Sequence, residues 1–190
     1  MTSDTEPSGT TAPGPERSRA APNIDESMEL AEKALRAGRW FEAERLAHRA
    51  LTLARRSEQW DTMARVTLPL QEARRLRREQ ALDSRRVVIV EDAVHDTDTV
   101  KPGCYLIQPP LVGADARRLR LSSLRQEVCA AVLCREPLTK LQRWPLVAIG
   151  AITIRAKVPP PKQPKKPTIE WFVAGMEALG DAACVFEVDW

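Results

Sequence analysis

The stretch "AEKALRAGRWFEAERLAHRALTLA", residues 31–54, carries small side chains at positions where a globular helix usually has leucine or phenylalanine. Its alanines recur at three- and four-residue steps, at Ala34, Ala37, Ala43, Ala47, Ala50 and Ala54. This spacing places them on one face of a helix. Gly38 breaks the pattern and fits the left-handed residue that ends a helix. The stretch therefore predicts two antiparallel helices in close contact, because facing alanines permit the short end of the usual range of about 8–10 Å between helix axes. Trp40 is expected to fill the gap at the turn.

Three helices are predicted in this part of the chain. The first begins near Asn23 or Asp25, either of which is a suitable N-cap, and ends at about Ala37. The second runs from about Trp40 to Arg56, and the third from about Glu58 to Leu82. Pro69 lies inside the third helix, where it removes one backbone hydrogen bond and is expected to cause a kink.

The pattern then changes to short apolar runs that are typical of buried strands. The runs are "RVVIVED" (86–92), "CYLIQ" (104–108), "CAAVLC" (129–134), "LVAIGAITIRAKV" (146–158) and "CVFEVDW" (184–190). We expect one helix capped by Asp115, with Leu121, Leu124 and Val128 on its apolar face. A second helix is expected to open at Thr168 and to close at Gly180. The predicted core of this part comprises Val88, Ile89, Leu106, Leu133, Val147, Ile149 and Ile152.

These elements predict an α+β protein built from a helical module and a small mixed α/β domain. Residues 1–22 are rich in Ser, Thr, Pro and Gly, bury almost nothing and are predicted to be disordered. The helical module spans residues 23–84, and the α/β domain spans residues 85–190. Within that domain "PPPKQPKKP", residues 159–167, predicts a stiff, extended and basic connector.

The composition is that of an ordinary globular protein, with 43% hydrophobic and 29% charged residues among 190. No apolar run approaches the length that a membrane helix needs. The four cysteines, Cys104, Cys129, Cys134 and Cys184, include no CxxC pair, which favours free thiols in the cytoplasm. Cys129 and Cys134 are an odd distance apart, so in a strand they would point to opposite faces and could not share a metal.

The run of Gly38, Trp40, Ala43, Ala47 and Ala50 resembles the tetratricopeptide repeat, as do Leu30 and Ala31 one helix earlier. That family pairs two helices in a 34-residue unit, with alanines along the second helix. A degraded second unit follows in residues 58–83. The proline that usually closes the unit is missing, and Arg55 and Arg56 stand near its place. The resemblance implies a surface that binds another protein.

The sequence therefore predicts a non-enzymatic adaptor or scaffold whose partner is another protein. The surface candidates for that partner are Trp60, Arg74, Arg77 and Arg78. One alternative is a nucleic-acid partner held by the Arg-rich helix at 74–78 and the basic connector, because arginine binds phosphate well. A net charge of +3 does not by itself support that alternative. A second alternative is an alanine-rich hairpin that serves only packing.

No catalytic motif is present. The chain has no Walker-type loop, no G-x-S-x-G and no H-E-x-x-H, so we predict no catalytic residue, cofactor or metal site. His48 is expected on the exposed side of its helix. His95 stands among carboxylates, in a segment that could hold a divalent metal but is more typical of a polar turn. Those carboxylates belong to Glu91, Asp92, Asp96 and Asp98.

Overall fold

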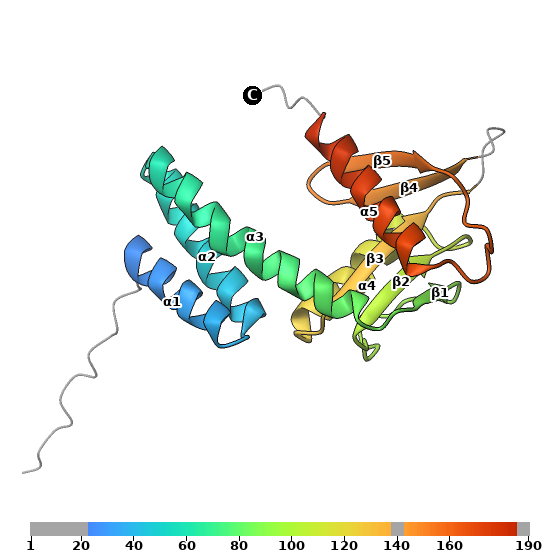
Figure 1. The fold of residues 1–190 in the computed structure, drawn as a ribbon, viewed down its shortest axis with the longest axis horizontal. Coiled ribbons are helices and arrows are strands. Elements are labelled where there is room, and N and C mark those ends of the chain that lie inside the picture. Colours follow the sequence, from blue (N-terminus) through green and yellow to red (C-terminus); the bar gives the residue numbers. More distant parts are fainter. Residues whose placement is uncertain (1–22, 138–142, 186–190) are drawn as a thin grey trace, which may run out of the picture.

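The computed structural model describes residues 23–137 and 143–185 (Figure 1). Three helices are followed by a five-stranded mixed sheet with further helices, which is an α+β arrangement as predicted. The prediction made for residues 1–22 lies outside the described residues, as does most of the strand predicted at 184–190. The first residue of that predicted strand, Cys184, is instead the last residue of a helix.

The helical module consists of α1 (Ile24–Arg36), α2 (Trp40–Arg56) and α3 (Trp60–Leu82). Asn23 is the N-cap of α1, and its side chain accepts a hydrogen bond of 2.8 Å from the amide of Glu26. α2 packs against both α1 and α3. Alanines occupy these contacts and are completely buried, which explains the pattern that the sequence showed. They are Ala31, Ala34, Ala43, Ala47, Ala50, Ala54 and Ala73.

The sheet has the order β1-β2-β3-β4-β5, in which β1, β2 and β3 are parallel and β4 and β5 continue it antiparallel. The strands are β1 (Val87–Val90), β2 (Gly103–Ile107), β3 (Ala130–Arg135), β4 (Trp144–Ile149) and β5 (Thr153–Val158). Helix α4 (Gly113–Arg125) connects β2 to β3, and α5 (Ile169–Cys184) follows β5.

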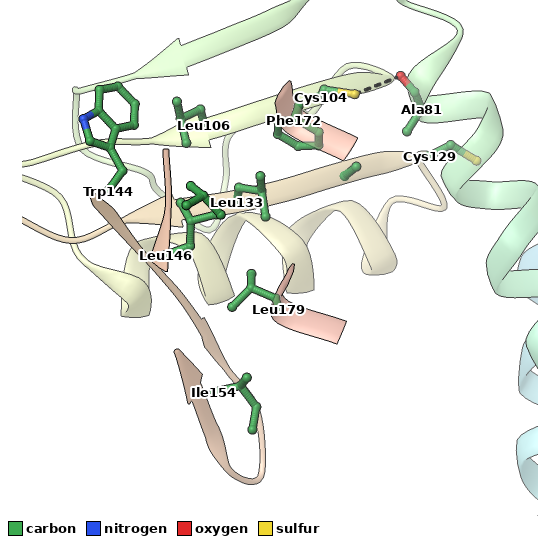
Figure 2. Close-up of a cluster of buried hydrophobic side chains, with 12 residues drawn as sticks. Ala81, Cys104, Leu106, Cys129, Leu133, Trp144, Leu146, Ile154, Phe172 and Leu179 are labelled. Carbon is green, nitrogen blue, oxygen red and sulfur yellow. Dashed lines mark hydrogen bonds between the residues drawn. The ribbon is translucent and has the colours of Figure 1, made fainter. Parts of the chain in front are cut away.

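The sheet is covered on both faces. α4 packs against β3 and β4, and α5 packs mainly against β5. The α5 side holds the larger apolar cluster, in which Phe172 is completely buried together with Leu106, Leu133 and Leu146 (Figure 2). Gly175 lets α5 lie close to the sheet, because a Cβ there would be 2.9 Å from Leu146 Cδ1.

The two cysteines near β3 lie in different layers, as their odd spacing predicted. Cys129 belongs to the apolar cluster under α5, and Cys134 belongs to the cluster under α4. They cannot share a metal ion or a disulfide across the sheet. All four cysteines are free thiols.

The predicted strand at 146–158 was wrong, because the segment is a hairpin of β4 and β5. Residues 150–152 form the turn, with Gly150 N donating to Ile152 O at 3.0 Å. Ile152 is therefore exposed at the turn, and Val88 is exposed on the edge strand β1, so neither belongs to the core. Leu106, Leu133 and Val147 are buried as predicted.

Two helix boundaries also differ from the prediction. α4 begins at Gly113, and Asp115 lies in its first turn, where its carboxylate accepts a bond of 2.9 Å from Val112 N. Its buried apolar side chain is Leu119, whereas Leu121 is exposed. α5 does not end at Gly180 but continues to Cys184. The connector is not fully extended, because Lys166 N donates to Gln163 O in a turn.

Candidate functional site

Helix α3 presents a line of apolar side chains to solvent. Trp60, Ala64 and Leu68 follow one another at four-residue steps, so they lie along one face of the helix. Trp60 is 65% exposed and Leu68 is 67% exposed, and Ala64 between them is exposed as well. We call these three residues the α3 stripe.

The opposite face of α3 holds the helix in the module. Val66 and Leu70 are buried in a cluster with Met28 and Ala47. Ala73 is completely buried against Ala34 and Ala43, one turn further along. Because α3 already buries this face, the exposure of the α3 stripe is not a consequence of a loosely packed helix.

Arg74 and Arg77 bind a carboxylate of the neighbouring helix. Arg74 Nε lies 2.8 Å from Glu44 Oε1, and Arg77 Nη1 bonds to Glu44 Oε2. The Arg77 guanidinium also lies 4.2 Å from the centroid of the Phe41 ring. Its side chain is only 13% exposed. These two arginines therefore connect α3 to α2, and a partner would find their charges already paired.

Arg75 and Arg78 form no ion pair with α2. Arg75 bonds to Glu72 and Glu79 along the surface of α3, and its guanidinium lowers the pKa of Glu72. Arg78 is exposed, and it forms no ion pair with any described residue. Since eighteen residues make five turns of a helix, Arg78 lies on the same face as Trp60. Arg75, fifteen residues after Trp60, also lies on this face, but its guanidinium is paired with Glu72 and Glu79. Arg78 is therefore the cation of the 74–78 cluster that lies on the same surface as the α3 stripe without an ion pair to a described residue.

Both histidines are exposed. His48 is exposed on α2, as predicted. The backbone amide of His95 donates to Asp98 Oδ2 at 2.7 Å, and Asp96 pairs with Arg125 at 3.1 Å. Within residues 23–137 and 143–185, no group of three His, Cys, Asp or Glu side chains is placed to hold a metal ion. The loop around His95 thus has the contacts of a polar turn.

Sequence reasoning missed Leu68. The signal was present, because Leu68 lies two helical steps of four residues after Trp60 and off the inward face marked by Val66 and Leu70.

Comparisons of the chain with protein-family models, with curated proteins and with solved structures found no match. Among the helices that the structure describes, none combines the length and the apolar character needed to cross a bilayer.

Proposed function

We propose that this chain is a non-catalytic adaptor that binds another protein through the outer face of α3. The observation that carries the proposal is the α3 stripe, since Trp60 and Leu68 are the two most exposed large apolar side chains of the helical module. Exposed tryptophan is costly in solvent and is enriched in the central residues of protein interfaces.

The arrangement of the module supports a tetratricopeptide-like origin. α1 begins at Ile24 and α3 at Trp60, close to the 34-residue spacing of that family. α3 therefore takes the position of the first helix of a second unit. In a longer array, another helix would cover its outer face, because stacked repeats bury their apolar faces against their neighbours.

The partner that fits this face is an amphipathic helix with an acidic group toward one end. Its apolar side would cover Trp60, Ala64 and Leu68, at the start of α3. Arg78 lies on the same face, about 15 Å beyond Leu68 along the helix axis, and would receive the acidic group. Helices commonly dock on grooves through anchors at such spacings.

The geometry favours this function over the binding of nucleic acid by the Arg-rich helix. Arg74, Arg75 and Arg77 each bond to carboxylates of the same chain. A phosphate would have to displace those partners, so residues 74–78 offer less free positive charge than their sequence indicates. Because all four cysteines are free, we also infer that the chain works in a reducing compartment such as the cytoplasm.

The test is capture of partners from native lysate by the tagged full chain, with and without nuclease. Captured proteins are identified by mass spectrometry, purified and titrated against the chain. We expect the double variant Trp60→Ala, Leu68→Ala to weaken binding about tenfold or more, because truncation of an interface tryptophan commonly removes a dominant contact. The matched control is Val112→Ala, Ile152→Ala, which truncates two exposed apolar side chains of the α/β domain.

Nuclease-resistant binding that the stripe variant loses and the control keeps would support the proposal. Equal binding by both variants would overturn it. A partner that is released by nuclease, and whose binding weakens in Arg78→Ala but not in the stripe variant, would instead support the nucleic-acid function.

A further inference from the structure

A groove of about 1070 Å³ lies where the end of α3 and the start of β1 face the connector and the start of α5. This is at the upper end of the size range of small-molecule sites, about 300–1,000 Å³, so the groove suits an extended ligand. Its lining includes Leu82, Arg85, Arg86, Val87, Pro160, Pro161, Lys162, Lys166, Pro167, Ile169, Glu170 and Trp171.

The charged side chains of the groove are mostly cationic. Arg85, Arg86, Lys162 and Lys166 line it, and none of them forms an ion pair with a described residue. The single lining carboxylate belongs to Glu170, in the first turn of α5. Hydrogen bonding to its own backbone amide and to Thr168 lowers the pKa of Glu170.

The uncharged lining of the groove is mostly apolar, with Gln163 and Thr168 as its polar members. Pro161 and Pro167 are buried, and Leu82, Val87 and Ile169 are half-buried. Two contacts hold the Trp171 side chain. Its Nε1 donates a hydrogen bond of 2.8 Å to Pro159 O, and its ring packs edge-on against the Trp144 ring, with 5.5 Å between the ring centroids. A single aromatic side chain fixed in this way does not form the series of stacking surfaces that single-stranded nucleic acids use. The groove therefore fits an acidic peptide with apolar side chains.

The chain itself contains a segment with that chemistry. Residues 185–190, "VFEVDW", alternate apolar and acidic side chains. In an extended conformation, Phe186, Val188 and Trp190 share one side, and Glu187 and Asp189 share the other. Val185, the one described residue of this segment, is 79% exposed.

The segment cannot reach the groove of its own molecule. The segment follows the C-terminal end of α5 in the sequence, whereas residues at the N-terminal end of α5 line the groove. Figure 1 shows these two helix ends on opposite sides of the sheet domain. Sixteen helical residues separate the two ends by about 24 Å. Six extended residues span about 20 Å at most, and part of that length would be used to reverse direction. An occupant of this sequence must therefore come from another molecule.

We propose that this basic groove binds residues 185–190 of a second copy of the chain, as an extended strand. The apolar side of the segment packs on the proline and Trp171 walls, and Glu187 and Asp189 meet the four cations at the rim. Two chains that exchange their segments form a closed dimer. The proposal uses residues remote from the α3 stripe, so it stands or fails independently of the adaptor function.

The test compares three variants of the full chain by sedimentation over a range of micromolar concentrations. The groove variant is Arg86→Glu, Lys162→Glu, and the segment variant is Glu187→Lys, Asp189→Lys. The control is Lys33→Glu, Arg49→Glu, which makes the same change of net charge as the groove variant, at exposed positions of the helical module. We expect the parent and the control to dimerise, and each of the other two to associate at least about tenfold more weakly, because charge reversal across an interface is repulsive.

Mixing supplies the decisive result, because it is insensitive to a general loss of stability. The groove variant keeps a normal segment, and the segment variant keeps a normal groove. Their mixture should therefore form a heterodimer through one intact interface, and 0.5 M salt should weaken it. A monomeric parent chain, or a mixture that stays monomeric, would overturn the proposal. Salt-sensitive binding of a labelled oligonucleotide that only the groove variant loses would overturn it in favour of a nucleic-acid groove.

Discussion

The buried alanines of α2 decide how closely the helical module is packed. Ala43, Ala47, Ala50 and Ala54 have no exposed surface, and they face α1 and α3 across two helix contacts. Each alanine removes side-chain volume and so lets two backbones approach. Larger apolar residues would bury more surface in themselves but would force the helices apart. The small side chains are therefore required for packing, and any binding function of α3 depends on that packing.

Replacing Ala47 by leucine tests this requirement. Ala47 packs against residues of α1 and α3, so added methylenes have no space and we expect a loss of about 1–3 kcal/mol in the free energy of unfolding. The measurement is urea denaturation followed by circular dichroism. Ala174→Leu on the exposed side of α5 is the matched control, and its stability should change by less than about 0.5 kcal/mol. Equal effects of both changes would contradict the packing argument.

The Cys134 thiol makes stability depend on alkaline pH. Burial, together with the nearby carboxylates of Glu136 and Asp115, raises its pKa to about 11. The unfolded thiol titrates near about 8.5, so between these values the folded state holds a proton that the unfolded state has lost. The contribution of this thiol to the free energy of unfolding is therefore fully present below the pKa of the unfolded state, and it is lost as the pH rises toward 11. We expect Cys134→Ala to lose less stability than the parent chain over this range, in urea titrations at several pH values. Cys184→Ala, which changes an exposed thiol, should behave like the parent.

At the scale of elements, three helix ends share one geometry. α1, α2 and α4 are each followed by a residue with positive φ, at Gly38, Glu58 and Glu127. In each case the next amide bonds back to the carbonyl five residues before it, as in Arg39 N to Ala34 O and Gln59 N to Ala54 O, both at 2.9 Å. Glycine adopts this conformation at little cost, whereas a side chain is strained there. The two glutamates are therefore local weaknesses in otherwise well-formed turns.

Glu58→Gly should stabilise the chain by about 0.5–1 kcal/mol, because it relieves the backbone at φ 54° and breaks no ion pair with a described residue. Thermal unfolding by calorimetry measures the change. The reverse experiment is Gly38→Ala, where φ is 71° and a Cβ would meet no atom within 4 Å. We expect Gly38→Ala to lower the free energy of unfolding by about 1 kcal/mol, from backbone strain alone. If Glu58→Gly were destabilising, the side chain of Glu58 would have a contact that outweighs its strain.

The elements that the sequence predicts well are those with a local signal. α2 follows directly from the spacing of its alanines, and α1 begins at Ile24, directly after the N-cap Asn23. The hairpin of β4 and β5 was hidden, because a continuous apolar run gives no period and its turn lacks Asn or Asp. Gly180 did not end α5, since a glycine inside a helix is tolerated at a cost of about 1 kcal/mol.

In the candidate site, too, the residues with a local signal were predictable and the contacts between distant residues were not. Trp60 is identified by its type and its position at a helix start. The pairing of Arg74 and Arg77 with Glu44 depends on a residue of another helix, so no pattern within 74–78 could indicate it. Leu68 was predictable from its spacing. The groove at the start of α5 combines segments from the middle and the end of the chain, and only the fold brings them together.

At the scale of the whole molecule, α3 belongs to both parts of the chain. Its beginning packs on α2, and its last turns pack on β2 and β3. Ala81 is a member of the apolar cluster under α5, and its carbonyl accepts a bond of 3.4 Å from Cys104 Sγ (Figure 2). Trp40 and Phe41 of α2 pack against the same cluster. The helical module therefore completes the core of the sheet domain, and these contacts bury apolar surface that the short module would not bury by itself.

This shared core predicts that both parts unfold in one transition. Circular dichroism follows mainly the helices, because α1, α2 and α3 supply most of the helical residues. Tryptophan fluorescence of the variant Trp40→Phe, Trp60→Phe, Trp190→Phe follows Trp144 and Trp171, which both belong to the sheet domain. We expect the two urea curves of this variant to coincide, as they do when a single cooperative unit unfolds.

Adding Ala81→Asp to this variant should separate the two curves. A carboxylate at Ala81 would be buried among apolar side chains, and the cation one turn before it, Arg77, is already paired with Glu44. Such burial is unfavourable enough to open the contact between α3 and the sheet. The helical module should then unfold at a lower urea concentration than the sheet domain, because its own core consists largely of alanines that bury little apolar area. Ala64→Asp, on the exposed face of the same helix, should leave the curves together. Two separate transitions before any change at Ala81 would mean that the module is stable by itself, and that the contacts of Ala81, Trp40 and Phe41 only position it.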